Sequence, residues 1–139
     1  MTAPARHPEH ALVAGPVTRT QIVRFAGAAG DFNPMHHDEA FATAAGEPSV
    51  FAMGQLTAAI VAGALSRWFG EEAIAAYGVR FRDKVWPGDR LRVHAGADVT
   101  GADVEGGGKT RYTLTVTRES DSTVVLTGWA RLRAETEVA

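Results

Sequence analysis

The segment from Met53 to Phe69 constrains the fold most, because it is apolar on nearly every side of a helix. Its few polar residues are Gln55, Thr57, Ser66 and Arg67. A helix with so few polar positions is buried on most sides and does not lie on a surface. Its longest apolar stretch covers about 13 residues, short of the roughly 20 that a membrane span requires. We therefore expect residues 53–69 to form a central helix inside a folded core.

After Gly70 the sequence changes from helical spacing to an alternation of apolar and polar residues, which is typical of strands with one buried face. The alternation runs through four segments, around Tyr77–Phe81, Leu91–Ala97, Tyr112–Val116 and Val124–Leu132. Turn-forming residues lie between them at Pro87–Asp89 and Gly106–Gly108. Several antiparallel strands after one buried helix predict an α+β fold, in which a single sheet wraps that helix.

The length and composition of the chain fit one domain. Its 139 residues suffice for one hydrophobic core and not for two. The chain has no cysteine, which excludes a disulfide scaffold, a thiol nucleophile and cysteine-ligated metal or iron–sulfur sites. A formal net charge of -2 gives no electrostatic reason to expect nucleic acid as a partner. Residues 1–10 are polar and lack the apolar stretch of a signal peptide, so we expect a cytoplasmic protein.

Two short helices are predicted before the central one. Thr18 followed by Gln21 has the pattern of a capping box, and the helix that it starts is expected to end near Gly27–Gly30. Asp38 is placed to cap the second short helix. A weak strand is expected ahead of both, over residues 11–17. The residues between the two helices then form a connecting loop.

This loop concentrates ionisable and amide side chains, namely Asp31, Asn33, His36, His37 and Asp38. A carboxylate and an imidazole five residues apart, across a rigid Asn-Pro step, can both face one water molecule. Histidine suits proton transfer because it exchanges its proton near neutral pH. The same residues also suit a purely structural loop, in which Asp31 and Asn33 form the turn and His36 is hydrogen-bonded. The two adjacent histidines do not predict a metal site, since neighbouring side chains diverge.

Two stretches closely resemble the signature of the MaoC-like hydratases and dehydratases, the (R)-specific enoyl-CoA hydratase family. Residues 30–38 read Gly-Asp-Phe-Asn-Pro-Met-His-His-Asp and match the family pattern G-D-x-N-P-[aliphatic]-H-x-D. Residues 80–91 resemble its R-F-x-x-x-V-x-P-G-D-x-L strand and turn. The two motifs stand in the expected order with the apolar helix between them, and the resemblance covers roughly residues 11–133.

The resemblance implies a hot-dog fold that usually works as a dimer in fatty-acid metabolism, without a cofactor. It implies an enzyme that interconverts trans-2-enoyl and (R)-3-hydroxyacyl thioesters, carried by coenzyme A or by acyl carrier protein. By motif position Asp31 and His36 would be the catalytic pair, with Asn33 and Pro34 in support. The backbone N–H of Gly54 would stabilise the oxyanion. The implied domain covers residues 10–134, between a flexible lead-in at 1–9 and a tail at 135–139.

The chain departs from the family at the start of the central helix, where relatives commonly carry His-Gly and this sequence reads Met53-Gly54. Because the implied oxyanion donor is a backbone N–H, we expect activity to survive. Met53 then either lines an acyl pocket, together with Phe51 and Gln55, or is a core residue.

The cations Arg80, Arg82 and Lys84 could meet substrate phosphates or an acidic carrier protein. They are equally what a solvated strand face carries.

Two alternatives to the hydratase remain open. A hot-dog thioesterase usually has an acidic residue on the central helix, and residues 53–69 contain none. A non-catalytic subunit that binds acyl chains and stabilises a sister hot-dog subunit is the second alternative. Because Asp31, Asn33 and His36 are all present, the chain resembles the catalytic half of such a pair. A homodimer and a heterodimer are both compatible with the sequence.

Overall fold

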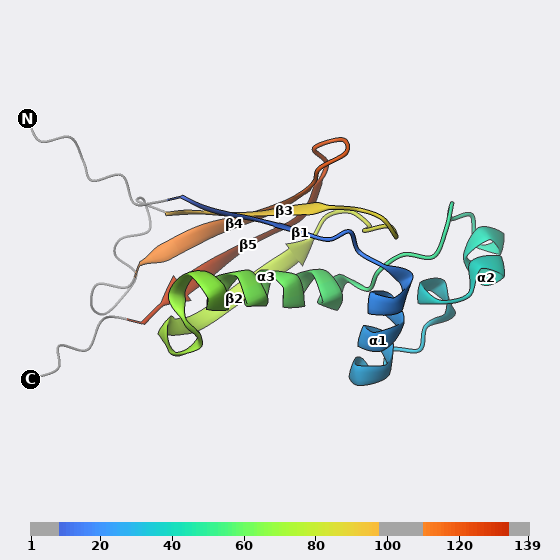
Figure 1. The fold of residues 1–139 in the computed structure, drawn as a ribbon, viewed down its shortest axis with the longest axis horizontal. Helices are drawn as coiled ribbons and strands as arrows, with labels where there is room; N and C mark the ends of the chain where they lie inside the picture. The colour runs from blue at the N-terminus through green and yellow to red at the C-terminus, as the bar shows by residue number, and fades with distance from the viewer. Residues whose placement is uncertain (1–8, 98–109, 134–139) are drawn as a thin grey trace, which may run out of the picture.

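A computed structural model describes residues 9–97 and 110–133. The chain forms one five-stranded sheet with the order β1-β3-β4-β5-β2, in which every neighbouring pair is antiparallel. The strands are β1 (His10–Ala14), β2 (Ile74–Phe81), β3 (Leu91–Ala97), β4 (Arg111–Arg118) and β5 (Val124–Leu132). The expected α+β arrangement is confirmed: the sheet lies along one long helix (Figure 1).

The long helix is α3 (Gly54–Phe69), and it begins one residue after the expected start because Met53 is its N-cap. Its buried face carries Val61, Ala64 and Leu65, none of which is exposed. These pack into one core with the inward positions of the sheet, among them Leu91, Val93, Leu114, Val116 and Leu126. Fully burying each such side chain contributes about 1.5–3 kcal/mol, so the sheet and α3 stabilise one another.

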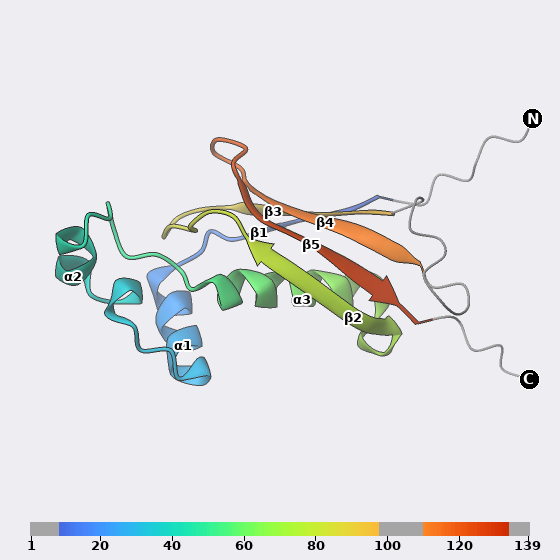
Figure 2. The ribbon, with the colours of Figure 1, turned by 180° about the vertical axis from the view of Figure 1, so that it is seen from behind.

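The long helix is buried or half-buried on most sides, as expected, and only one stripe of it is exposed. Gln55, Ala59, Gly63 and Arg67 recur every fourth residue, and all four are exposed. A spacing of four places them on one stripe of the helix. Figures 1 and 2 both show the sheet along one side of α3. Two of the four polar residues of the segment, Gln55 and Arg67, lie on this stripe, and Ala59 and Gly63 make up the rest of it.

Three shorter elements gather at the N-terminal end of α3 (Figure 1). They are α1 (Arg19–Ala29), the 3-10 turn η1 (Pro34–His36) and α2 (Glu39–Ala44). The predicted caps are present: Thr18 accepts a hydrogen bond from the Gln21 N–H, and Asp38 accepts one from the Phe41 N–H. A second 3-10 turn, η2 (Glu71–Ala73), connects α3 to β2.

The expected strand over residues 11–17 is shorter, because β1 ends before Gly15 and Pro16. The predicted Gly106–Gly108 turn, residues 1–8 of the predicted lead-in at 1–9, and the tail at 135–139 lie outside the described residues. Within the described part of the chain, no helix combines the length and apolar character needed to cross a bilayer.

Candidate active site

The loop after α1 is held by its own backbone and by Asn33. Helix α1 ends at Gly30 with a φ of 69°, a left-handed conformation that glycine adopts readily. The Asp31 N–H then donates to the Ala26 carbonyl over 3.0 Å. The Asn33 side-chain oxygen accepts from the Met35 N–H over 3.0 Å, which caps η1. Because η1 ends at His36, this cap fixes where the imidazole leaves the backbone.

His36 is buried, with an exposed fraction of 8%, and its ring is held on two sides by Phe51. Nδ1 lies 2.7 Å from the Phe51 carbonyl oxygen, and the Phe51 ring meets the imidazole edge-on with centroids 5.3 Å apart. A carbonyl oxygen only accepts hydrogen bonds, so Nδ1 carries the proton. In the neutral ring Nε2 therefore has a free lone pair.

Nε2 of His36 faces the Asp31 carboxylate across 3.7 Å. This separation exceeds a direct hydrogen bond and suits two groups that share a bridging water. The Asp31 side chain is 41% exposed, so solvent reaches the Asp31 side of this gap. The His36 side chain is only 9% exposed. The structure thus brings the two predicted residues together. The Nε2 atom of His36 and the Asp31 carboxylate face the same small gap.

A short segment connects His36 directly to the start of α3. The Phe51 N–H donates to the Met35 carbonyl over 3.3 Å, and the Ala52 N–H donates to the Val85 carbonyl over 2.8 Å. Gly54 follows as the first residue of α3, three residues after the carbonyl that binds His36. The first N–H groups of a helix lack partners within the helix, and its N-terminus carries partial positive charge. Met53 caps this end without a side-chain hydrogen bond.

An open cleft of about 400 Å³ lies at this end of α3. It is lined by Phe51, Ala52, Gly54, Thr57, Phe81, Arg82, Asp83, Lys84, Val85 and Val125. Asp31 and His36 are not among the lining residues, and Phe51 borders both the cleft and the imidazole. Of the three candidate pocket residues, only Phe51 lines this cleft. Met53 is 3% exposed in the core, and Gln55 is exposed on α3.

Gly54 packs closely against the ring of Phe81. A Cβ at Gly54 would lie 2.9 Å from three atoms of that ring, closer than side chains approach. Phe81 is itself 46% exposed at the edge of the sheet. A glycine here therefore allows the β2 strand to approach the N-terminus of α3.

The three candidate cations have different partners. Lys84 pairs with Glu47 over 2.6 Å and lies 5.2 Å from the centroid of the Phe51 ring. Arg82 donates through Nε to the Thr127 hydroxyl over 3.1 Å. Arg80 is exposed and makes no ion pair with any described residue. Arg82 and Lys84 therefore both line the cleft beside α3, whereas Arg80 does not.

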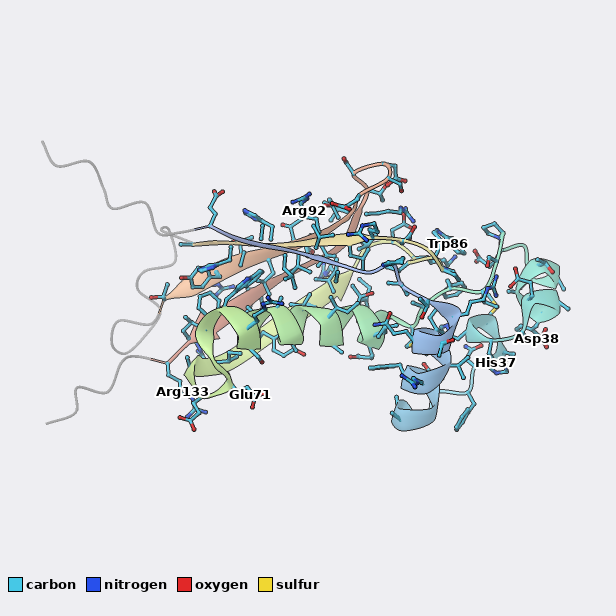
Figure 3. The ribbon with its side chains drawn as sticks, viewed as in Figure 1. His37, Asp38, Glu71, Trp86, Arg92 and Arg133 are labelled. Carbon is cyan, nitrogen blue, oxygen red and sulfur yellow. The ribbon has the colours of Figure 1, made fainter. Side chains whose placement is uncertain are left out.

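His37 is turned away from the Asp31–His36 pair. Its Nε2 lies 3.3 Å from the Phe32 carbonyl, and the residue is exposed beside Asp38 and α2 (Figure 3). Within the described residues, no group of three or more His, Asp or Glu side chains could hold a metal ion. The two adjacent histidines thus differ: one is buried and paired, and the other is a surface residue.

Sequence reasoning missed Arg118, which fastens the loop that follows β2. Its guanidinium bonds Asp83 and Asp121 over 3.1 Å each and the Lys84 carbonyl over 3.2 Å. Burial opposes the charge of Arg118, but Asp121, Asp89 and Asp83 outweigh that effect and raise its pKa above the ordinary value. The next carbonyl, that of Val85, receives the Ala52 N–H. No local pattern around Arg118 could indicate partners 34 residues away.

Comparison with known proteins gives three kinds of match. The family model of the MaoC like domain matches residues 2–121. A curated relative, the enoyl-CoA hydratase ChsH3 of Mycobacterium tuberculosis, is 32% identical over 129 residues. The match covers 91% of this chain but 41% of that protein, so the chain spans less than half the length of its relative.

Solved structures share the fold at lower identity. The R-hydratase PhaJ1 from Pseudomonas aeruginosa has a TM-score of 0.79 and 23% identity, covering 94% of this chain and 81% of that one. The (R)-hydratase from A. caviae has a TM-score of 0.79 and 21% identity, with 94% and 98% covered. The ChsH1–ChsH2 complex from Mycobacterium tuberculosis has a TM-score of 0.72 and 21% identity, and the match covers 94% of this chain and 96% of that one. These matches confirm the hot-dog fold.

Proposed function

The chain belongs to the MaoC-like domain family of hydratases and dehydratases, as its two motifs predict, and on this premise we propose that it interconverts trans-2-enoyl and (R)-3-hydroxyacyl thioesters. Asp31 and His36 are the acid–base pair, and the Gly54 N–H is the oxyanion donor. The observation that carries the proposal is the bond from His36 Nδ1 to the Phe51 carbonyl, which leaves Nε2 facing Asp31 across 3.7 Å.

In the hydration direction, a water held between Asp31 and His36 donates one hydrogen bond to each. As one acceptor takes its proton, the water oxygen forms a bond to C3 of the enoyl chain. The C2–C3 π electrons move towards the thioester oxygen and give an enolate. The enolate then collapses, and C2 receives a proton from the protonated acid–base pair. Dehydration runs through the same steps in reverse.

The enolate intermediate needs hydrogen-bond donors that are already in place. The start of α3 fits this need, because Gly54 contributes a backbone N–H at the positive end of the helix dipole. Gly54 also lines the cleft next to Phe51, whose carbonyl binds His36. Three residues of chain reach at most about 11 Å, so the Phe51 carbonyl that holds His36 lies no farther than this from Gly54.

Hydration of crotonyl-CoA, followed as loss of the enoyl absorbance, tests the assignment. We expect Asp31→Asn and His36→Gln each to lower kcat by about 10²–10⁴-fold, the usual contribution of a general acid or base. His37→Gln is the matched control, because it makes the same change at an exposed neighbouring histidine and should retain the wild-type rate. Chiral chromatography of the product should show the (R)-alcohol. Equal rates in the wild type and both variants would refute the catalytic pair.

We further propose that the chain works as a pair of hot-dog subunits, either two copies or one copy with a sister subunit. Strand β2, one edge of which pairs with no described strand, lies beside α3, which carries the exposed stripe (Figure 2). Tyr77 and Phe81 at that edge are 39% and 46% exposed, which is unusual for large apolar side chains of a strand that flanks the core. A partner seated there would cover both surfaces.

A further inference from the structure

Thr57 on α3 is a buried polar residue whose hydroxyl has no partner. Apart from Tyr112, three residues with polar side chains are buried in the described part of the chain: His36, Thr57 and Arg118, with exposed fractions of 8%, 3% and 7%. His36 and Arg118 are each hydrogen-bonded. The Thr57 hydroxyl makes no hydrogen bond to any described residue. A hydroxyl kept at such a position costs free energy unless something pairs with it.

The hydroxyl of Thr57 is not engaged by its own helix. A threonine within a helix can donate to the carbonyl three or four residues earlier, which satisfies its hydroxyl locally. Thr43 of α2 does this, donating to the Glu39 carbonyl over 2.8 Å. Thr57 of α3 is more deeply buried than Thr43 and makes no such bond. Its hydroxyl therefore remains available to a ligand.

The free hydroxyl opens into the cleft at the start of α3. Thr57 lines this cleft of about 400 Å³, together with Gly54. Every fully enclosed side-chain oxygen or nitrogen among the described residues has a hydrogen bond. Because the Thr57 hydroxyl has none, it is not fully enclosed, and the surface that it reaches is the wall of the cleft.

The cleft has a buried end and an exposed rim. The exposed residues that line it are Phe81, Arg82 and Asp83. The buried ones are Ala52, Thr57, Val85 and Val125. Among these four, Thr57 alone has a polar side chain. A ligand that enters the buried end thus meets an apolar wall with a single hydroxyl in it.

Of the two ends of a thioester substrate, only the acyl chain is small enough for the buried end of the cleft. The carrier, whether coenzyme A or a protein, is bulky and polar and stays on the solvent side. Thr57 follows Gly54 by three residues, which is about 4.5 Å along the helix axis and on the same face. With the thioester oxygen at the Gly54 N–H, the Thr57 hydroxyl therefore faces acyl atoms beyond the reacting carbons.

We propose that Thr57 makes the site select acyl chains that carry a hydrogen-bond acceptor, such as an ether or carbonyl oxygen, a few bonds beyond the C2–C3 double bond. This inference rests on the proposed function, because it needs the thioester oxygen at Gly54. An oxygen in the chain accepts a hydrogen bond from the Thr57 hydroxyl. A plain alkyl chain covers the hydroxyl and leaves it unpaired, and a site with an unpaired polar group discriminates against such a substrate.

Two pairs of substrates that differ by one oxygen test this selection. In 4-methoxycrotonyl-CoA an ether oxygen replaces one CH₂ of 2-hexenoyl-CoA, and 5-methoxy-2-pentenoyl-CoA relates in the same way to 2-heptenoyl-CoA. The ratio of kcat/KM for the ether to that for the alkyl chain is compared between wild type and Thr57→Val, so that differences in the reactivity of the substrates themselves cancel. This ratio should fall about tenfold in Thr57→Val for at least one pair, the order expected for one lost hydrogen bond.

Two further variants and a stability measurement exclude a structural explanation. Thr57→Ser keeps the hydroxyl and should retain the wild-type ratio. Thr43→Val makes the same change at an exposed threonine and should also leave the ratio unchanged. The urea midpoint of Thr57→Val should not fall, because no hydrogen bond within the protein is lost. A lower midpoint would reveal a structural role for the hydroxyl and overturn the proposal.

The remaining outcomes separate this proposal from the hydratase assignment. Equal ratios in wild type and Thr57→Val for both pairs would overturn the selection by Thr57 and leave the hydratase assignment standing. Failure of the wild type to hydrate crotonyl-CoA and all four longer thioesters would refute the hydratase assignment, and the selection by Thr57 with it.

Discussion

The carbonyl oxygen of Phe51 determines which nitrogen of His36 is available for proton transfer. By accepting from Nδ1 it fixes the tautomer and directs the Nε2 lone pair towards Asp31. A backbone carbonyl does this without a titrating group, so the orientation of the ring is maintained whatever the protonation state of nearby carboxylates. The Phe51 ring adds an edge-on contact that restricts rotation of the imidazole.

Gly54 shows how one missing Cβ shapes the site. In Gly54→Ala the added methyl would meet the Phe81 ring at 2.9 Å, so the ring or the helix start must move. We expect a loss of about 1–3 kcal/mol in the free energy of unfolding, the usual cost of overpacking, together with a lower hydration rate. Urea unfolding measures the first, and the crotonyl-CoA assay measures the second.

The second substitution Phe81→Leu separates the two effects of Gly54→Ala. Leucine leaves room for the methyl, so the double variant should regain most of the lost stability. If Gly54→Ala alone were as stable and as active as the wild type, the close approach of Phe81 to the helix would not constrain this position.

Among the elements, the loop between β2 and β3 depends on β4 and the hairpin that follows it. Arg118, the last residue of β4, holds Asp83 and the Lys84 carbonyl on one side and Asp121 on the other. Because the adjacent Val85 carbonyl receives the Ala52 N–H, the segment that carries Phe51 is supported by an arginine more than 60 residues later in the chain. The site thus rests on a contact between distant loops.

Acid should weaken this contact between loops. The pKa of Asp121 lies below its ordinary value, chiefly because the Thr123 N–H donates to it and also because Arg118 is adjacent. A carboxylate with a lowered folded-state pKa contributes stability above its unfolded pKa of about 3.9 and loses it as pH falls through the folded value. The urea midpoint of the wild type should therefore fall more between about pH 6 and about pH 2, a range that extends well below the unfolded pKa, than the midpoint of Asp121→Asn. Parallel pH profiles would show that Asp121 contributes nothing through its charge.

At the scale of the whole molecule, the exposed stripe of α3 is the surface we expect a second subunit to cover. Gly63 lies on it, and a Cβ there would meet nothing within 4 Å of this chain. Gly63→Arg should therefore preserve the subunit fold while preventing close approach of a partner. Sedimentation measurements should show a shift from dimer to monomer.

Gly27→Arg provides the control for that measurement. Gly27 is also a helical glycine with open space around it, but it lies on α1 and away from the stripe. It should leave the mass of the assembly unchanged. A wild type that is monomeric at every concentration, or a Gly63→Arg variant that remains dimeric, would contradict this view of α3.

The sequence was informative wherever structure follows from local patterns. Thr18 and Asp38 act as the predicted helix caps, and the alternation after Gly70 produces the predicted strands. It could not indicate contacts that depend on strand register or on backbone atoms. The placement of Trp129 over Gly78, the partners of Arg118 and the bond from His36 to a carbonyl 15 residues later all arise only when the chain is folded.

The open edge of β2 has a consequence for folding in the cell. This strand has eight residues, and one side of its backbone pairs with no described strand. Such an edge can template pairing with any other exposed strand, which is how aggregates begin. Pairing between subunits covers this edge, and a higher protein concentration favours the paired, folded state. The melting temperature should therefore rise with protein concentration. The concentration of the partner subunit, and not the sequence of one subunit alone, then determines how long the chain stays in solution without aggregating.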